Sequence, residues 1–294
     1  MLFSIADFIV EVLFSGTDTR DVLSPRSYKP FWLADESSAS TDRLFVCELV
    51  DDGLGKDIAK ELGQFESAGV TNGVFTRHAG GYFLQVRNVE GQLAALVETT
   101  ADFARLRVQL FGDLNNRRYG LNNAMMIGFA FSSALHHTLL IHASVTMKEG
   151  RGYLFLGRSG TGKSTHSRQW LENISGTELL NDDNPAVRLH SDGIARVYGT
   201  PWSGKTPCYK QQSATVGAFV RIVQHPENLI SRDPAPLALS SILSSSSTMI
   251  WDKQTYSATC NTIAKILAST PAYTLRCRPE PAAAYLCHDT VYSA

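Results

Sequence analysis

The stretch GRSGTGKS, from Gly157 to Ser164, has the spacing of a phosphate-binding loop. Glycines at fixed positions let the backbone curl, so that successive N–H groups point inward at phosphate oxygens. We expect Lys163 to reach the outer phosphates and Ser164 to offer its hydroxyl to Mg²⁺. The predicted nucleotide contacts are Gly157, Arg158, Ser159, Gly160, Thr161, Gly162, Lys163, Ser164 and Thr165.

A pair of aspartates, Asp182 and Asp183, closes the apolar run ELLNDD downstream of the loop. A metal-bound nucleotide needs an acidic group opposite the loop hydroxyl, and a hydroxyl acceptor needs a carboxylate to take or orient its proton. Two adjacent aspartates can divide these tasks, and the sequence leaves open which of them does which. The alternative is a solvated turn before Pro185.

Two further segments carry candidate side chains. His142 lies in the apolar stretch LLIHASV before the loop. Its imidazole could serve as a metal ligand, a hydrogen-bond donor to phosphate or a proton shuttle. By residue type and spacing alone, a histidine satisfied within the core is the favoured interpretation. The segment YGTPWSGK ends at Lys205 and suits either a substrate-holding loop or the exit turn of a hairpin with a surface lysine.

These side chains need elements to position them. GYLFLG predicts a strand that leads into the loop, and THSRQWLENI predicts the helix that follows it. TLLIHASVTM predicts one strand, joined to GYLFLG through the polar turn KEGRG, and AVRLHSDGIARVYG predicts a hairpin. Residues from about 115 to 137 predict a mostly buried helix.

Composition places the chain among ordinary globular proteins. It has 294 residues, of which 44% are apolar and 19% charged, with a net charge of −1. That charge gives no overall attraction to nucleic acid or to an anionic membrane, so we expect neither as a partner. An odd count of 5 cysteines without a CxxC pair, and the lack of a signal-peptide pattern or long apolar span, favour a cytoplasmic protein.

The chain is long enough for two domains. Residues 1–112 predict a small N-terminal α/β or β-rich module without a motif of recognisable chemistry. Residues 113–294 predict a nucleotide-binding catalytic domain that contains every motif described above. The expected fold class is therefore α/β.

The order HAS, GRSGTGKST, LNDD and YGTPWSGK resembles the HPr serine kinase C-terminal family, which shares a fold superfamily with phosphoenolpyruvate carboxykinases. The resemblance covers roughly residues 115–290. It implies a mixed-sheet catalytic domain with the nucleotide loop between strand and helix. It also implies that Asp182 and Asp183 serve metal binding and base catalysis, and that His142 belongs to the active site.

The chain departs from that family at several points. Thr165 stands where HPr kinases usually carry a glutamate, and the later glycine-rich signature has no clear counterpart. The N-terminal 110 residues do not obviously match the HPr kinase N-terminal domain. We therefore expect a divergent member whose acceptor is not HPr.

The function that these observations predict is an ATP-dependent kinase, assisted by Mg²⁺ or Mn²⁺. Its acceptor would be a hydroxyl of a protein, a peptide or a small molecule, and relatives that assemble as multimers make a homo-oligomer an option. Two alternatives stay open: a carboxykinase-like enzyme and a non-catalytic nucleotide-binding sensor or scaffold. The predicted catalytic residues are His142, Lys163, Asp182, Asp183 and Lys205, and the predicted metal ligands are Ser164, Asp182 and Asp183.

Overall fold

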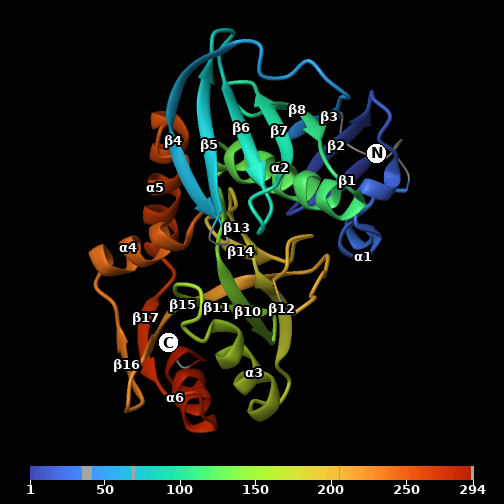
Figure 1. Cartoon of the computed structure of the whole chain (residues 1–294). Coiled ribbons are helices and arrows are strands. Elements are labelled where there is room, and N and C mark those ends of the chain that lie inside the picture. Colours follow the sequence, from blue (N-terminus) through green and yellow to red (C-terminus); the bar gives the residue numbers. More distant parts are fainter. Residues whose placement is uncertain (35–41, 68–69, 205, 293–294) are drawn as a thin grey trace. The chain divides into compact units, whose positions relative to one another are not determined.

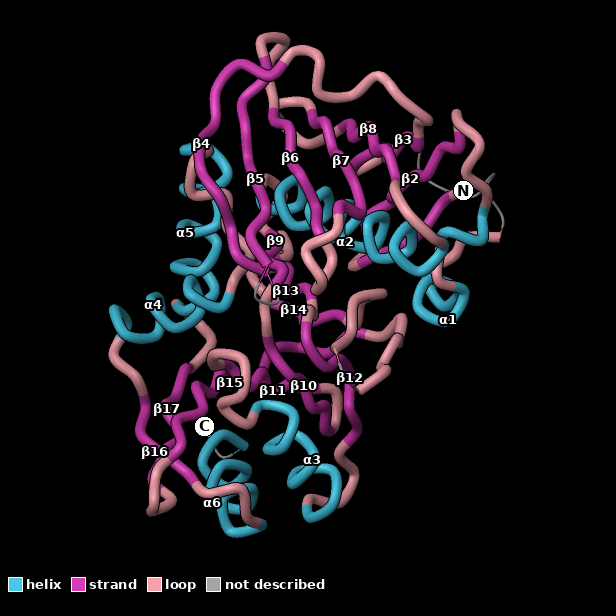
Figure 2. The backbone as a smooth tube through the Cα atoms, viewed as in Figure 1, coloured by secondary structure: helices cyan, strands magenta, loops and turns pink. Residues whose placement is uncertain are grey.

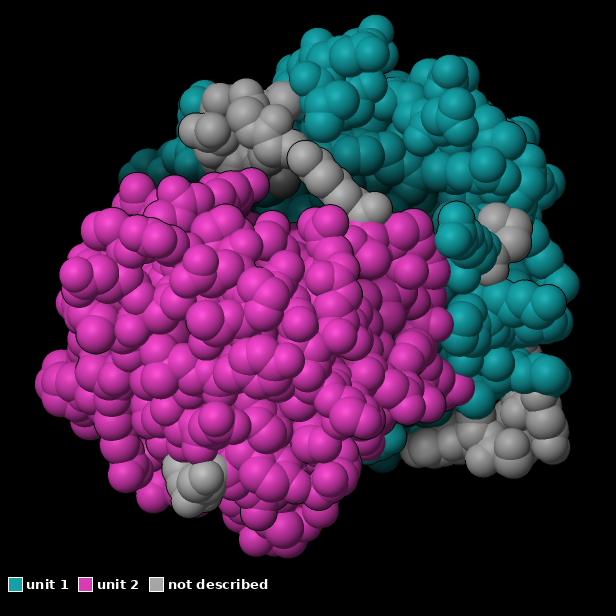
Figure 3. All heavy atoms as spheres, turned by 90° about the horizontal axis from the view of Figure 1, so that it is seen from below, with its two compact units in different colours: residues 1–133 teal, residues 134–294 magenta. Residues whose placement is uncertain are grey.

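The computed structural model describes residues 1–34, 42–67, 70–204 and 206–292. The chain forms two compact units, Met1–Ser133 and Ala134–Ala294, which Figure 3 colours separately. The described residues form two mixed sheets and six α-helices, so the α/β class predicted from the sequence is confirmed. Each unit is described by itself below.

The first unit is built on an eight-stranded sheet (Figure 1). Its strands follow the order β1-β2-β3-β8-β7-β6-β5-β4, with β2, β3 and β8 parallel and the other neighbours antiparallel. The strands are β1 (Leu2–Ile5), β2 (Phe8–Phe14), β3 (Phe45–Leu49), β4 (Ile58–Ser67), β5 (Val70–Arg77), β6 (Tyr82–Arg87), β7 (Leu93–Thr99) and β8 (Arg105–Leu110). The helical elements are η1 (Arg20–Val22), α1 (Pro25–Tyr28), η2 (Lys29–Phe31) and α2 (Leu114–Ala134).

Helix α2 covers one face of this sheet. An added Cβ at Gly120 would lie 2.5 Å from the carbonyl oxygen of Ala94, so the helix backbone rests almost directly on β7. Phe129 packs edge-on against Phe8 with ring centroids 6.3 Å apart. These contacts place α2 with the first unit, whereas the expected boundary between residues 112 and 113 would separate it from that sheet.

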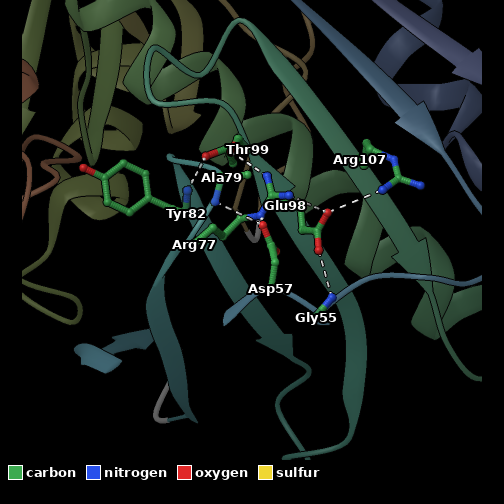
Figure 4. Close-up of polar contacts among 8 residues, drawn as sticks. All are labelled: Gly55, Asp57, Arg77, Ala79, Tyr82, Glu98, Thr99 and Arg107. Atoms are coloured by element: carbon green, nitrogen blue, oxygen red, sulfur yellow. Dashed lines mark hydrogen bonds and ion pairs between the residues drawn. The ribbon is translucent and has the colours of Figure 1, made fainter. Parts of the chain in front are cut away.

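A buried carboxylate ties the loop before β4 to the sheet of the first unit (Figure 4). Glu98 is 3% exposed; Gly55 N donates to its Oε1 at 2.8 Å, and Arg77 Nη2 lies 3.2 Å from its Oε2. Arg77 also donates from Nε to Asp57 Oδ1 at 3.0 Å, and Arg107 Nη1 lies 3.5 Å from Glu98. The buried charge is therefore paired and hydrogen-bonded, as a buried carboxylate requires.

The second unit is built on a nine-stranded sheet with four helices (Figures 1 and 2). Its strands are β9 (Thr138–Leu140), β10 (Ala143–Lys148), β11 (Arg151–Leu156), β12 (Glu178–Asp183), β13 (Ala186–Leu189), β14 (Ala195–Tyr198), β15 (Ser213–Gln224), β16 (Leu229–Arg232) and β17 (Ala272–Cys277). Its helices are α3 (Lys163–Asn173), α4 (Ala235–Ser245), α5 (Lys253–Leu267) and α6 (Pro281–Tyr292).

The sheet of the second unit runs in the order β12-β10-β11-β15-β14-β13-β9, and β17 pairs with β15 and β16. Alternate residues of its strands enter two cores. Tyr153 and Phe155 pack with Trp170 of α3 and Ala283 of α6, whereas Leu154 packs with residues of α4 and α5 on the opposite face. Helices therefore cover both faces of the strand that carries the phosphate loop.

The segment TLLIHASVTM forms two strands, and the prediction of one continuous strand is wrong. β9 pairs with β13 at one end of the sheet, while β10 pairs with β11 and β12 near the other end. Ile141 N still donates to Pro185 O at 3.0 Å, one residue beyond the β9–β13 pairing, whereas His142 N donates to Ser245 O at 2.7 Å before β10 begins at Ala143. His142 therefore lies in the break between the strands. The predicted turn KEGRG and the hairpin of β13 and β14 are confirmed.

Within the described ranges, no helix combines the length and the apolar character needed to cross a membrane.

Candidate active site at one edge of the second sheet

Strand register brings three of the predicted segments to one edge of the second sheet. Ala143 of β10 pairs with Leu156 of β11 on one side and with Asp183 of β12 on the other. Both pairings are antiparallel, so the start of β10 meets the ends of β11 and β12. The phosphate loop after Leu156, His142 and the aspartate pair therefore share this edge.

The loop has the backbone conformation that its glycines allow. Gly157, Gly160 and Gly162 have φ of 147°, 81° and 105°, values that side-chain-bearing residues rarely adopt. An added Cβ at Gly160 or Gly162 would meet no atom within 4 Å, so the space beside both glycines is open. Gly162 is also the N-cap of α3, and no side chain caps its free N–H groups.

Lys163 lies at the base of this loop. Its Nζ donates to the carbonyl oxygens of Gly157 at 2.9 Å and of Arg158 at 3.4 Å. Burial lowers the pKa of the Lys163 ammonium below its ordinary value, and the charges of Asp183 and Asp182 oppose that shift. The cation is thus held within the curl of the loop by the loop's own carbonyl oxygens.

Ser164 and Asp182 are in direct contact. The Ser164 hydroxyl donates to Asp182 Oδ1 at 2.8 Å, and the Asp182 side chain is buried at 5% exposure. A serine hydroxyl beside a carboxylate is the donor pair with which phosphate loops hold Mg²⁺. Across the described ranges, no group of three or more His, Cys, Asp or Glu side chains is arranged to hold a metal ion.

Asp183 has a different environment from its neighbour. His142 Nε2 lies 3.0 Å from Asp183 Oδ1, and Asn184 Nδ2 donates to Oδ2 at 3.1 Å. The Asp183 side chain is 38% exposed, so it faces the open side of the edge. Its backbone has φ of 139°, which is strained for a residue other than glycine.

The segment after β14 lies against the aspartates. Ser203 forms an antiparallel bridge with Asp183, and its hydroxyl donates to Asp182 O at 3.1 Å. Gly204 N donates to the same oxygen at 2.6 Å. The structure thus brings residues 200–204 of YGTPWSGK to the site, whereas the predicted catalytic residue Lys205 lies outside the described residues.

Of the remaining residues predicted to contact the nucleotide, some lie exposed in the loop and one lies in helix α3. Arg158, Ser159 and Gly160 are exposed at the tip of the loop, Thr161 Oγ1 donates back to Arg158 O at 2.8 Å, and Thr165 is half-buried in the first turn of α3. Three residues that the sequence did not assign to the site make contacts there. Asn181 and Thr200 are hydrogen-bonded to each other next to the aspartates, and Gln224 Nε2 donates to Gly160 O of the loop at 3.2 Å. Asn181, a polar residue within an apolar strand, was the one signal available.

The sequence matches no known protein-family model, and no curated protein matches it.

Proposed function

We propose that this protein is a kinase that transfers the γ-phosphoryl group of ATP to a hydroxyl group, as a divergent member of the HPr kinase and phosphoenolpyruvate carboxykinase superfamily. The observation that carries the proposal is that the two aspartates, which lie at the same sheet edge as the phosphate loop, have different partners. Asp182 contacts the hydroxyl of Ser164, and Asp183 faces outward beside His142. A nucleotide clamp needs the first contact, and only group transfer needs the second.

The residues present fit Mg·ATP. The open space beside Gly160 and Gly162, the uncapped start of α3 and the ammonium of Lys163 suit the β- and γ-phosphates. Ser164 and Asp182 would hold Mg²⁺, which keeps most of its other ligands as phosphate oxygens and water. When bound, Mg²⁺ supplies neutralisation of the phosphate charge.

The chain's own groups then divide the chemistry. The acceptor oxygen bonds to the γ-phosphorus, the bond from that phosphorus to the bridging oxygen breaks, and ADP leaves. Asp183 takes the proton of the acceptor hydroxyl, because its carboxylate faces the open edge, while His142 and Asn184 hold that carboxylate. Lys163 stabilises charge on the transferring group.

The test separates nucleotide binding from transfer. We expect Asp182→Asn to weaken binding of a fluorescent ATP analogue only when Mg²⁺ is present, and Lys163→Ala to weaken it by about 10-fold or more with or without the metal. Asp183→Asn should leave binding intact and lower transfer of labelled γ-phosphate into a whole-cell extract by about 10²- to 10⁴-fold. Asp192→Asn, in the hairpin turn of β13 and β14, is the matched control and should change neither.

Three results would contradict the proposal. Unchanged nucleotide affinity in Lys163→Ala would refute the loop assignment. Phosphoenolpyruvate formed from oxaloacetate, nucleotide and Mn²⁺ would favour the carboxykinase alternative. Tight Mg·ATP binding without transfer to any component of the extract would favour a nucleotide sensor or scaffold.

A further inference from the structure

A buried polar pair lies directly behind the aspartates. Asn181 precedes them in β12 and is 0% exposed, and Thr200 follows β14 and is also 0% exposed. Asn181 Nδ2 donates to Thr200 Oγ1 and to Trp202 O, both at 3.3 Å, and its Oδ1 accepts from Asn184 N at 3.1 Å. An amide placed in an apolar strand costs free energy unless it is hydrogen-bonded, and here each of its groups has a partner.

The Thr200 hydroxyl completes the arrangement. It donates to Asn184 O at 2.6 Å, with Trp202 O as a more distant acceptor at 3.2 Å, and it accepts from Trp202 N at 3.2 Å and from Asn181 Nδ2 at 3.3 Å. A hydroxyl offers one hydrogen and two lone pairs, so these contacts use its full capacity. The Asn181–Thr200 pair therefore joins the chain after β12 to the chain after β14.

Both of those segments hold Asp183. On one side, Asn184 follows Asp183 and donates to its carboxylate. On the other side, Ser203 bridges to it, and an added Cβ at Gly204 would lie 3.1 Å from Asp183 Cβ. Asp183, whose backbone φ of 139° is strained, is therefore held from both sides. A strained backbone persists only where its surroundings fix it, and such strain gathers at functional sites.

We propose that Asn181 and Thr200 are positioning residues that fix the backbone of Asp183 and thereby the direction of its carboxylate. The inference rests on the proposed function, because it assigns Asp183 the proton of the acceptor. A displacement of about 1 Å at a reacting group can lower a rate by about 100-fold without altering the binding of the rest of the substrate. The side-chain hydrogen bonds of Asn181 and Thr200 run to each other, to Asn184 and to Trp202 rather than to the phosphate loop, so nucleotide affinity should not depend on the pair.

Isosteric variants of Thr200 test the proposal. Thr200→Val removes the hydroxyl and keeps the shape, and we expect single-turnover transfer to fall by about 100-fold while the dissociation constant of the ATP analogue changes less than about twofold. Thr200→Ser restores the hydroxyl and should recover most of the rate. Thr146→Val is the matched control: Thr146 Oγ1 is buried in the same sheet without a hydrogen-bond partner, so its removal should leave the rate unchanged.

Three outcomes would overturn the inference: an unchanged rate in folded Thr200→Val, a parallel loss of rate and affinity, or no rescue by Thr200→Ser. If the wild-type chain binds nucleotide but transfers nothing, the proposed function fails. A double-mutant cycle measured by Tm then still tests whether Thr200 holds the backbone of Asp183. Asp183→Gly relieves the strained backbone, so its effect on Tm should differ between the wild-type and Thr200→Val backgrounds. Additive changes in Tm would show that Thr200 does not hold Asp183.

Discussion

A single buried imidazole beneath the phosphate loop makes the stability of the protein depend on acidity. His166 is 4% exposed, packs edge-on against Phe155 at 4.7 Å between ring centroids, and accepts a hydrogen bond at Nε2 from Trp170 Nε1 at 3.1 Å. Burial lowers the pKa of His166 from 6.5 to about 4. The neutral ring is therefore part of the core that supports α3.

The sign of the pH effect follows from that shift. Between pH 6.5 and about 4, the unfolded chain binds a proton at His166 that the folded chain does not, so the free energy of unfolding falls as the pH falls through this window. The loss from this residue should approach about 3 kcal/mol at the acid end. Urea unfolding at a series of pH values measures it.

His166→Gln is the matched variant, because its side-chain oxygen can still accept from Trp170 and it does not titrate. We expect the difference in unfolding free energy between wild type and variant to shrink steadily from pH 7 to pH 4. A difference that stays constant over that range would mean that His166 titrates alike in both states.

The motif residues could be predicted from the sequence, while their supporting residues could not. Ser164, Asp182 and the loop glycines are encoded by local spacing, and the structure brings them together. Asn181 and Thr200 lie in segments that the sequence singled out, but their pairing could not be predicted, because it is a contact across 19 residues of chain. The sequence likewise could not tell which of Asp182 and Asp183 binds the metal and which acts as the base, because the two adjacent residues are identical.

Helix α2 offers a test of packing at the scale of an element. Replacing a helical glycine by alanine ordinarily stabilises a helix by about 1 kcal/mol. At Gly120 the added Cβ would meet Ala94 O at 2.5 Å, and backbone of β7 cannot yield as a flexible side chain can. We expect Gly120→Ala to lower the free energy of unfolding of the first unit by about 1–3 kcal/mol.

Asn115→Ala is the control, since Asn115 is exposed in the same helix and its change tests propensity alone. It should be neutral or slightly stabilising in the same thermal or denaturant measurement. If Gly120→Ala also stabilised the protein, α2 would not lie against β7 as the structure has it.

Among the elements, those built from neighbouring residues followed the sequence pattern closely. The hairpin of β10 and β11 turns at Glu149 and Gly150, where both φ values are positive, as a tight polar turn predicts. The break at His142 did not follow the pattern, because LLIHASV is apolar on both sides of it. At that break His142 N donates to Ser245 O, and this contact with a residue far along the chain has no local pattern to indicate it.

At the scale of the whole molecule, each unit has its own sheet, so we expect two unfolding transitions in calorimetry. Mg·ATP at about 100 times its dissociation constant should stabilise the second unit alone by about 2.7 kcal/mol. Three of the four tryptophans, Trp170, Trp202 and Trp251, belong to the second unit, so tryptophan fluorescence reports mainly on that transition. Lys163→Ala should abolish the shift. Equal increases in the temperatures of both transitions would contradict a nucleotide site formed by the second unit alone.

The order in which the second unit pairs its strands has a consequence for a chain still being made. Strands β10 and β11 adjoin in sequence and close over a two-residue turn, whereas β11 and β15 pair in parallel across a long intervening chain, and β12 follows only after α3. Contacts between distant residues form slowly, because a long loop must close first. The phosphate loop therefore precedes its aspartates in time as well as in sequence. Under the proposed function, the segment that would hold the phosphates is therefore made before the carboxylates that would direct their transfer.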